Sequence, residues 1–189
     1  KHGESSVIVT LLTQGHGRHV GLVRGGAGRR QRANYQIGNR LAATWRARLE
    51  EQLGSYSCEL VRAYAAEVMS AKLPLAALSS AAILVDMTLP EREPHENVFS
   101  EFSNLLDALL RPDWESKYVL WELGYLSALG FGLDLASCAV TGVTENLTHV
   151  SPRSGRAVST EAGAAYRDRL LVLPEFLRVD SAMKPPVHA

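Results

Sequence analysis

The stretch "RHVGLVRGGAGRRQR" (Arg18–Arg32) runs from an apolar segment into a loop of arginine and glycine. In its first half, Val20, Leu22 and Arg24 alternate with a second row of side chains, and this period of two predicts a half-buried β-strand. The nine residues from Arg24 to Arg32 contain four arginines and three glycines, which end the strand and open a loop. Such a loop can cradle phosphate, contact nucleic acid or form a solvated turn, and the choice depends on its surroundings.

Three further strands are predicted around this loop. "SSVIVTLLT" (Ser5–Thr13) is apolar and β-branched, and "GSYSCELV" (Gly54–Val61) has a similar character. In "GNRLAATWRARLE" (Gly38–Glu50) apolar side chains alternate with arginines, which predicts a strand with its arginines on the solvated face. The apolar row consists of Leu41, Ala43, Trp45, Ala47 and Leu49. Four strands joined by glycine-rich turns within the first 62 residues predict a small antiparallel barrel with one basic surface.

Beyond Arg62 the hydrophobic period becomes helical. Helices are predicted at residues 59–72, 73–89, 96–110 and 114–130. The core stripe of the third helix consists of Val98, Phe102, Leu105, Leu106 and Leu109. A hairpin is predicted at residues 149–159, a short capped helix from Thr160, and a mobile tail at 179–189. The fold class is therefore α+β, with a β domain at residues 1–62 and a helical domain at 63–189.

The charges of this 189-residue chain are strongly polarised, although the formal net charge is zero. Residues 1–50 hold nine basic residues against Glu4 and Glu50, a net charge of +7, and the remaining residues carry −7. A basic region of this kind indicates contact with a polyanion. The candidate residues are the arginines Arg18, Arg24, Arg29, Arg30, Arg32, Arg40, Arg46 and Arg48.

Arginine side chains suit the binding of phosphate, because their planar fork of donors matches phosphate oxygens and also stacks on bases. The loop has neither the lysine nor the hydroxyl of a Walker motif, so nucleotide hydrolysis is not supported. Tyr35 and Trp45 are candidates for base stacking or for the core. Three readings stay open: DNA binding, RNA binding, and a protein-interaction scaffold that grips an acidic partner.

Other functions find little support in the sequence. No catalytic triad elbow, metalloprotease helix or carboxylate pair is present, so we do not expect an enzyme. Cys138 stands where a zinc ribbon would open, but Thr141, Ser159 and Ala162 occupy the other three ligand places. No metal or other cofactor is therefore expected. Two cysteines and the lack of a long apolar run favour a reducing, cytoplasmic location without a membrane span.

The helix predicted at residues 114–130 is apolar almost all round, which is typical of a core helix. Alternatively, one edge of this helix forms the floor of an apolar groove for a partner peptide, with Lys117 near a carboxylate of that peptide. The candidate residues for such a peptide are Lys117, Leu120 and Trp121.

Three segments, taken in order, resemble the RecO family of bacterial DNA repair and recombination mediator proteins. They are "GESSVIVTLLTQGHGRHVGLVRGGAGRR" (3–30), "LEEQLGSYSCEL" (49–60) and "WELGYLSALGFGLDLASCAVTG" (121–142). The resemblance implies an N-terminal OB-fold, whose first strand would precede Lys1, and a helical domain with a degenerate zinc-ribbon hairpin at about 138–162.

The resemblance also implies a function. It implies that the chain binds single- and double-stranded DNA, anneals complementary strands, and helps to load the RecA recombinase onto DNA covered by single-strand-binding protein (SSB). The implied partners are RecR and the C-terminal peptide of SSB, and the implied location is the cytoplasm, in association with the nucleoid. The family's basic barrel face corresponds approximately to the eight arginines named above, and its peptide pocket lies in the helical domain.

Overall fold

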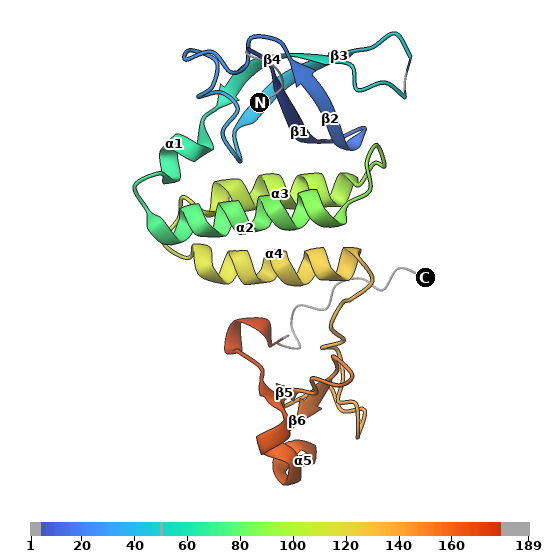
Figure 1. Cartoon of the computed structure of the whole chain (residues 1–189). Helices are drawn as coiled ribbons and strands as arrows, with labels where there is room; N and C mark the ends of the chain where they lie inside the picture. The colour runs from blue at the N-terminus through green and yellow to red at the C-terminus, as the bar shows by residue number, and fades with distance from the viewer. Residues whose placement is uncertain (1–4, 50, 179–189) are drawn as a thin grey trace. The chain divides into compact units, whose positions relative to one another are not determined.

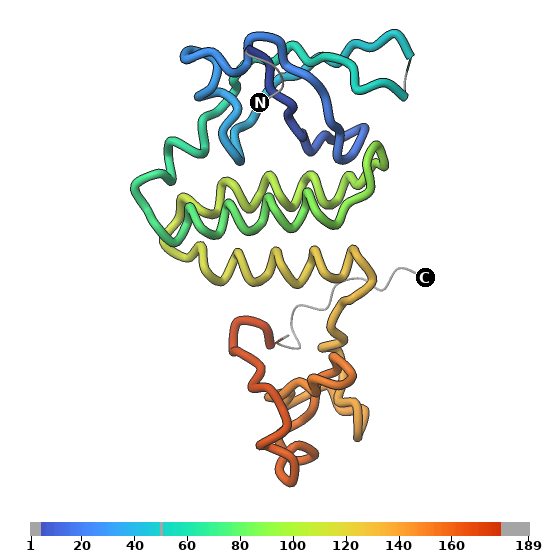
Figure 2. Tube along the Cα trace, in the orientation of Figure 1, coloured from blue at the N-terminus to red at the C-terminus, as the bar shows by residue number. Residues whose placement is uncertain are grey.

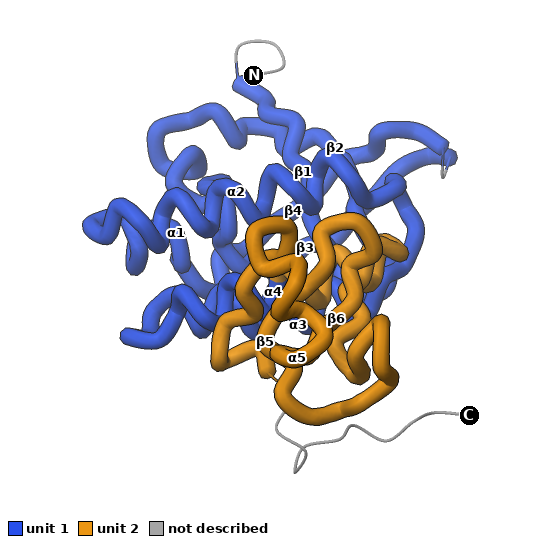
Figure 3. The backbone as a smooth tube through the Cα atoms, turned by 90° about the horizontal axis from the view of Figure 1, so that it is seen from below, with its two compact units in different colours: residues 1–121 blue, residues 122–189 orange. Residues whose placement is uncertain are grey.

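The computed structural model describes residues 5–49 and 51–178 (Figures 1 and 2). The chain forms two compact units, residues 1–121 and residues 122–189, which are coloured separately in Figure 3. The boundary between them falls within helix α4 (Trp114–Ala128). The predicted tail at 179–189 lies outside the described residues.

The first unit begins with a four-stranded sheet in the order β1-β2-β4-β3. Its strands are β1 (Val7–Thr13), β2 (Gly17–Val23), β3 (Arg40–Arg46) and β4 (Ser55–Arg62). The pairs β1–β2 and β3–β4 are antiparallel, whereas β2 and β4 run parallel and meet at Leu22 and Ser55. All four predicted strands are thus confirmed. Within the described residues the sheet stays open between β1 and β3, so the predicted closed barrel is not present there.

The alternation in the sequence corresponds to alternating burial in the strands. In β2 the buried row contains Gly17, His19, Gly21 and Val23, as the period of two predicted. In β3 the alternation is weaker, because only Leu41 and Trp45 are partly covered. Beyond Arg46 the strand has ended, and the predicted apolar positions Ala47 and Leu49 are exposed.

The helices of the first unit lie beneath this sheet in Figure 1. They are α1 (Tyr64–Val68), α2 (Lys72–Thr88), α3 (Glu96–Ala108) and the first half of α4. The predicted stripe of α3 is confirmed, since four of its five side chains are buried and Phe102 is partly so. None of the helices in the described part of the chain has the length and apolar character needed to cross a membrane.

The prediction of a helix from residue 59 was wrong in its first turn. Glu59 and Leu60 pair with Ala42 and Leu41 in the β3–β4 ladder, so β4 continues to Arg62. The sheet contacts override the local helical pattern, because each strand residue gains a ladder partner from β3.

The second unit contains a three-stranded sheet in the order β6-β5-β7. Its elements are β5 (Leu147–Val150), β6 (Ala157–Ser159), α5 (Thr160–Gly163), a 3₁₀ turn η1 (Ala164–Arg169), β7 (Leu171–Val172) and η2 (Glu175–Leu177). The predicted hairpin is confirmed as β5–β6. The hydroxyl oxygen of Ser159 accepts a hydrogen bond from the amide of Ala162 and caps α5, but Tyr166 leaves helical geometry and the helix ends early.

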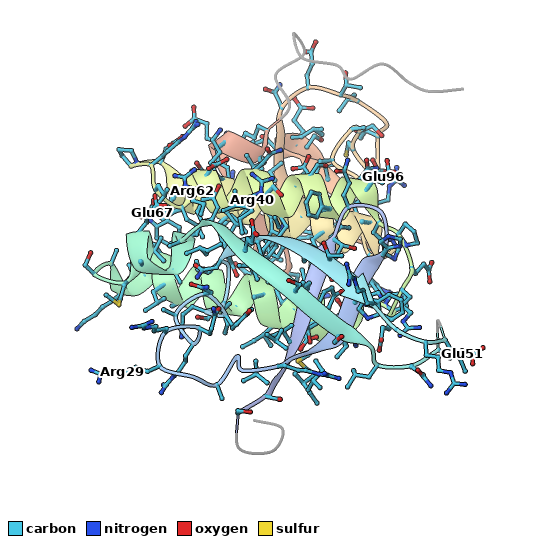
Figure 4. All side chains as sticks on the ribbon, turned by 90° about the horizontal axis from the view of Figure 1, so that it is seen from above. Arg29, Arg40, Glu51, Arg62, Glu67 and Glu96 are labelled. Atoms are coloured by element: carbon cyan, nitrogen blue, oxygen red, sulfur yellow. The ribbon has the colours of Figure 1, made fainter. Side chains whose placement is uncertain are left out.

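Arg62, at the end of β4, joins the sheet to two helices of the first unit. Its guanidinium binds both carboxylate oxygens of Glu67 at 2.9 and 3.0 Å and the Asp107 carboxylate at 2.7 Å. The buried Tyr64 hydroxyl donates to the same Asp107 oxygen at 2.7 Å, and the Arg62 guanidinium lies 4.3 Å from the Tyr64 ring centre. Figure 4 shows Arg62 and Glu67 close to one another. This network holds the end of β4 against α1 and α3.

We expect Tyr64→Phe to lower the free energy of unfolding by roughly 1 to 2 kcal/mol, because it deletes a hydrogen bond to a carboxylate. Urea unfolding measures the change. Tyr166→Phe, at an exposed tyrosine, is the control and should stay within about 0.5 kcal/mol of the parent protein. Equal effects from both substitutions would contradict the role of the network.

The same network predicts a dependence of stability on pH. Hydrogen bonds from Arg62 lower the pKa of Glu67 below its ordinary value. A depressed carboxyl pKa stabilises the folded state above the unfolded pKa, and this stabilisation is lost as pH falls through the folded pKa. Glu67→Gln should therefore reduce the loss of stability on acidification, measured as urea midpoints from neutral to acidic pH. An unchanged acid profile would show that Glu67 does not contribute.

Candidate nucleic-acid interface

Seven of the eight predicted arginines are exposed, and they lie in three places on the first unit. The loop between β2 and β3, residues 24–39, holds Arg24, Arg29, Arg30 and Arg32. Arg40 is the first residue of β3 and Arg46 the last, and Arg48 lies in the β3–β4 hairpin. Within residues 5–49 and 51–178, no ion pair is formed by any of these seven side chains.

The loop between β2 and β3 is built from successive turns, which can be followed in Figure 2. The Gly28 amide donates to the Gly25 carbonyl at 3.0 Å, and the Gly28 carbonyl accepts from the amides of Gln31 and Arg32. Gly25 has a φ of +72°, which favours glycine because a Cβ is strained in that region. The amide of Ala27 donates to the Ser5 carbonyl at 3.0 Å and ties the loop to the start of β1. The sequence of arginines and glycines therefore forms a hydrogen-bonded loop rather than a free one.

The structure does not bring the arginines together at a single point. Arg40 and Arg46 are at opposite ends of β3, and a seven-residue strand separates its ends by about 20 Å. In Figure 4, Arg29 lies at one end of the sheet, Glu51 of the β3–β4 hairpin lies at the other, and Arg40 lies between them near Arg62. The candidate interface is thus a broad surface. The loop arginines and Arg40 lie toward one end of β3, and Arg46 and Arg48 lie toward the other.

Arg18 is the exception among the eight. Its side chain is 21% exposed, and its Nε donates to the Leu89 carbonyl at 3.1 Å. The carboxylates of Asp86 and Glu91 lie 3.7 and 4.0 Å from the guanidinium. Arg18 therefore anchors β2 to the end of α2, and its charge is already balanced by carboxylates of α2 and of the loop that follows it.

Trp45 fixes the base of the β3–β4 hairpin. Its Nε1 donates to the Leu53 carbonyl at 3.1 Å, and its ring lies edge-on to His19 at 5.0 Å. Gly54 packs directly on the ring, where any Cβ would collide with it. These contacts favour the structural reading of Trp45 over base stacking. Tyr35 is also partly buried and hydrogen-bonds to Cys58.

The buried pair His19 and Tyr56 lies under this hairpin. The Tyr56 hydroxyl and His19 Nδ1 are 2.7 Å apart. Burial, with the positive charge of Arg92 as a smaller cause, lowers the pKa of His19. Burial also raises the pKa of Tyr56 to about 12. Both side chains are therefore uncharged at neutral pH and add nothing to the basic surface.

Sequence reasoning did not identify Arg92, which lies in the loop between α2 and α3. Its guanidinium is 5.5 Å from the Trp45 ring centre and donates to the Gln52 carbonyl at 2.8 Å. Its backbone amide donates to the Arg18 carbonyl at 2.8 Å. In the sequence Arg92 stands between two glutamates, which suggests only a solvated charge run, and no local signal reveals contacts with residues about 40 positions away.

Hydrogen bonds join the residues of the second unit that were compared with a zinc ribbon. The Cys138 sulfur accepts from the Ser159 amide at 3.3 Å. Burial raises the pKa of Cys138, but hydrogen bonds from Thr141 and Ser159 outweigh this effect and lower it overall. Within the described residues no group of three or more histidine, cysteine or acidic side chains could hold a metal ion. The adjacent core consists of Cys138, Leu147, Val150, Ala157, Val158 and Leu173.

The three residues proposed for a partner peptide have different environments. Lys117 is exposed and Leu120 is 44% exposed, so both are accessible to a partner. Trp121 is 5% exposed and packs against Phe102 and Tyr118, with ring centres 6.0 and 5.9 Å apart. Trp121 is therefore a core residue of the first unit rather than part of an accessible peptide site.

Comparison with known proteins gives two family matches. Residues 1–64 match the model described as "Recombination protein O N terminal", and residues 73–183 match "Recombination protein O C terminal". Residues 65–72 separate the two matched regions, whereas the compact units divide after residue 121.

Several curated proteins are similar over most of the chain. The "DNA repair protein RecO" of Rhodospirillum centenum is 57% identical over 178 residues, which cover 93% of this chain and 71% of that protein. The protein of the same name from Rhodospirillum rubrum is 51% identical over 182 residues, covering 93% and 72%. That of a Jannaschia species is 48% identical over 173 residues, covering 92% and 71%.

We expect Arg18→Ala to lower the free energy of unfolding by roughly 1 to 2 kcal/mol, because it breaks a hydrogen bond and two ion pairs that join β2 to the end of α2. Arg24→Ala removes the same charge from an exposed loop and should change stability by less than about 0.5 kcal/mol. Urea unfolding of both variants measures the difference. If Arg24→Ala proved as destabilising as Arg18→Ala, the anchoring role of Arg18 would be wrong.

Proposed function

Because the chain belongs to the RecO family of DNA repair proteins, we propose that it binds single- and double-stranded DNA through a set of exposed arginines in its first unit. One observation carries this proposal. Residues 5–49 contain eight arginines and no acidic residue, and seven of the eight arginines are exposed. A segment of this composition attracts a polyanion, because these residues contribute no carboxylate of their own.

The chemistry of these side chains suggests how DNA is held. Guanidinium groups bind phosphate oxygens, which all sequences share, so binding gives affinity with little sequence preference. Neutralising the phosphates of two strands reduces their mutual repulsion, and contacts confined to the backbone leave the bases free to pair. The protein thereby anneals complementary strands and assists the loading of RecA onto DNA covered by SSB. This function requires no catalytic residue, and we propose that the chain is not an enzyme.

We further propose that the sheet belongs to an OB-fold. This fold is a five-stranded, partly open barrel that binds oligonucleotides. A groove of about 560 Å³ runs between the two edge strands β1 and β3, and it is lined from below by α2 and α3. Its floor includes Val85, Phe102 and Leu106. One further strand between β1 and β3 would fill this groove and close the sheet.

The remaining parts of the function concern partners. RecR and the C-terminal peptide of SSB are the proposed protein partners, and the cytoplasm with its nucleoid is the proposed location. For the SSB peptide, Lys117 and Leu120 on α4 are accessible, whereas the burial of Trp121 argues against its direct contact.

Charge reversal tests this proposal. The double variant Arg29→Glu and Arg30→Glu should abolish binding of a labelled single-stranded oligonucleotide at moderate salt and slow the annealing of complementary strands. For the parent protein, affinity should fall as salt rises, because bound phosphates release counterions. Binding that is indifferent to salt would refute the proposal. If the variant kept its DNA affinity but lost an acidic protein partner, the scaffold function would replace it, and preferred binding of competing RNA would indicate an RNA-binding protein.

A further inference from the structure

Resting on the proposed function, we propose that the nucleic-acid backbone is bound by the β2–β3 loop alone, and that the arginines of the β3–β4 hairpin lie outside the site. The site then consists of Arg24, Arg29, Arg30 and Arg32, with Arg40 at its border. Three observations distinguish this loop from the hairpin. They are the hydrogen-bonded turn of the loop, the position of Glu59 on β4, and the balance of charges at the tip of the hairpin.

The loop presents its arginines on a fixed turn. The Gly28 carbonyl accepts from the amides of Gln31 and Arg32 at 3.0 and 2.9 Å, so residues 28–32 form one helical turn. Arg29, Arg30 and Arg32 therefore belong to one hydrogen-bonded turn. Fixing the backbone in this way reduces the conformational entropy that is lost when the ligand binds.

A carboxylate interrupts the path from the loop to the hairpin. In the β3–β4 ladder Glu59 pairs with Ala42, and cross-strand partners point to the same face of a sheet. Arg46 lies four residues after Ala42 and so shares that face. Glu59 is exposed, and a strand running along β3 from Arg40 to Arg46 would pass over its negative charge.

The tip of the hairpin is balanced in charge. The sequence from Arg46 to Leu53 contains two arginines and two glutamates, so its formal charge is zero. Glu51 is exposed there and points away from the rest of the sheet in Figure 4. At a separation of about 20 Å from Arg40, the hairpin arginines are more than two Debye lengths away at physiological salt and add little to the potential at the loop.

Two double variants with the same change in net charge test the inference. Arg29→Ala with Arg30→Ala removes two loop arginines, and Arg46→Ala with Arg48→Ala removes two hairpin arginines as the matched control. The measurement is the dissociation constant of a labelled oligothymidylate strand at several salt concentrations. Four phosphates bound by the loop give a slope of log affinity against log salt of roughly −2.8. The loop variant should reduce this slope by about 1.4, and the hairpin variant should leave it unchanged.

Equal losses in the two variants, or a loss confined to the hairpin variant, would overturn the inference while leaving the proposed function intact. If the parent protein showed no salt-dependent binding, both the inference and the proposed function would be wrong. All four side chains are exposed, so unfolding midpoints equal to that of the parent protein should accompany both variants and exclude misfolding as the cause.

Discussion

Arg18 and Arg62 reach from the sheet to carboxylates of the helical layer and its α2–α3 loop, and these contacts distinguish the two side chains from the exposed arginines of the first unit. Arg18 meets Asp86 and Glu91, and Arg62 meets Glu67 and Asp107. An arginine that is paired in this way joins the sheet to the helices, and its charge is largely cancelled for any ligand. Seven exposed arginines without an ion pair lie in the β2–β3 loop, on β3 and in the β3–β4 hairpin, and they leave positive charge available at the surface of the described residues.

The sequence predicts those parts of this arrangement that depend on the local order of apolar and polar residues. The period of two in residues 18–24 predicts the two alternating rows of β2, although not which row is buried, and the stripe of α3 follows from its helical spacing. The exposed loop follows from its glycines and arginines. The pairing of Arg18 was not predictable, because its partners stand about 70 positions later in the chain and only folding brings them close. At Glu59 and Leu60 the local pattern fitted both the strand predicted through Val61 and the helix predicted from residue 59, and the ladder partners on β3 decide for the strand.

In the second unit, hydrogen bonds and apolar packing join the segments around Cys138. At the four ribbon positions only Cys138 keeps a thiol, and its sulfur accepts a backbone hydrogen bond from Ser159 across the hairpin. The hydroxyl oxygen of Ser159 caps α5, and six buried side chains form the core beside it. Sequence spacing identified the positions, but the hydrogen bonds between them depend on the folded register of β5 and β6.

The distribution of carboxylates also bears on how two strands can be brought together. A ligand bound only by backbone contacts at the β2–β3 loop would leave its bases unengaged, since Trp45 is held by Leu53, His19 and Arg92 and is not free to stack. The acidic side chains of β4 and the hairpin would keep that ligand from spreading over the sheet. A short, backbone-only contact dissociates readily as salt rises, and such reversibility suits the strand annealing that we propose.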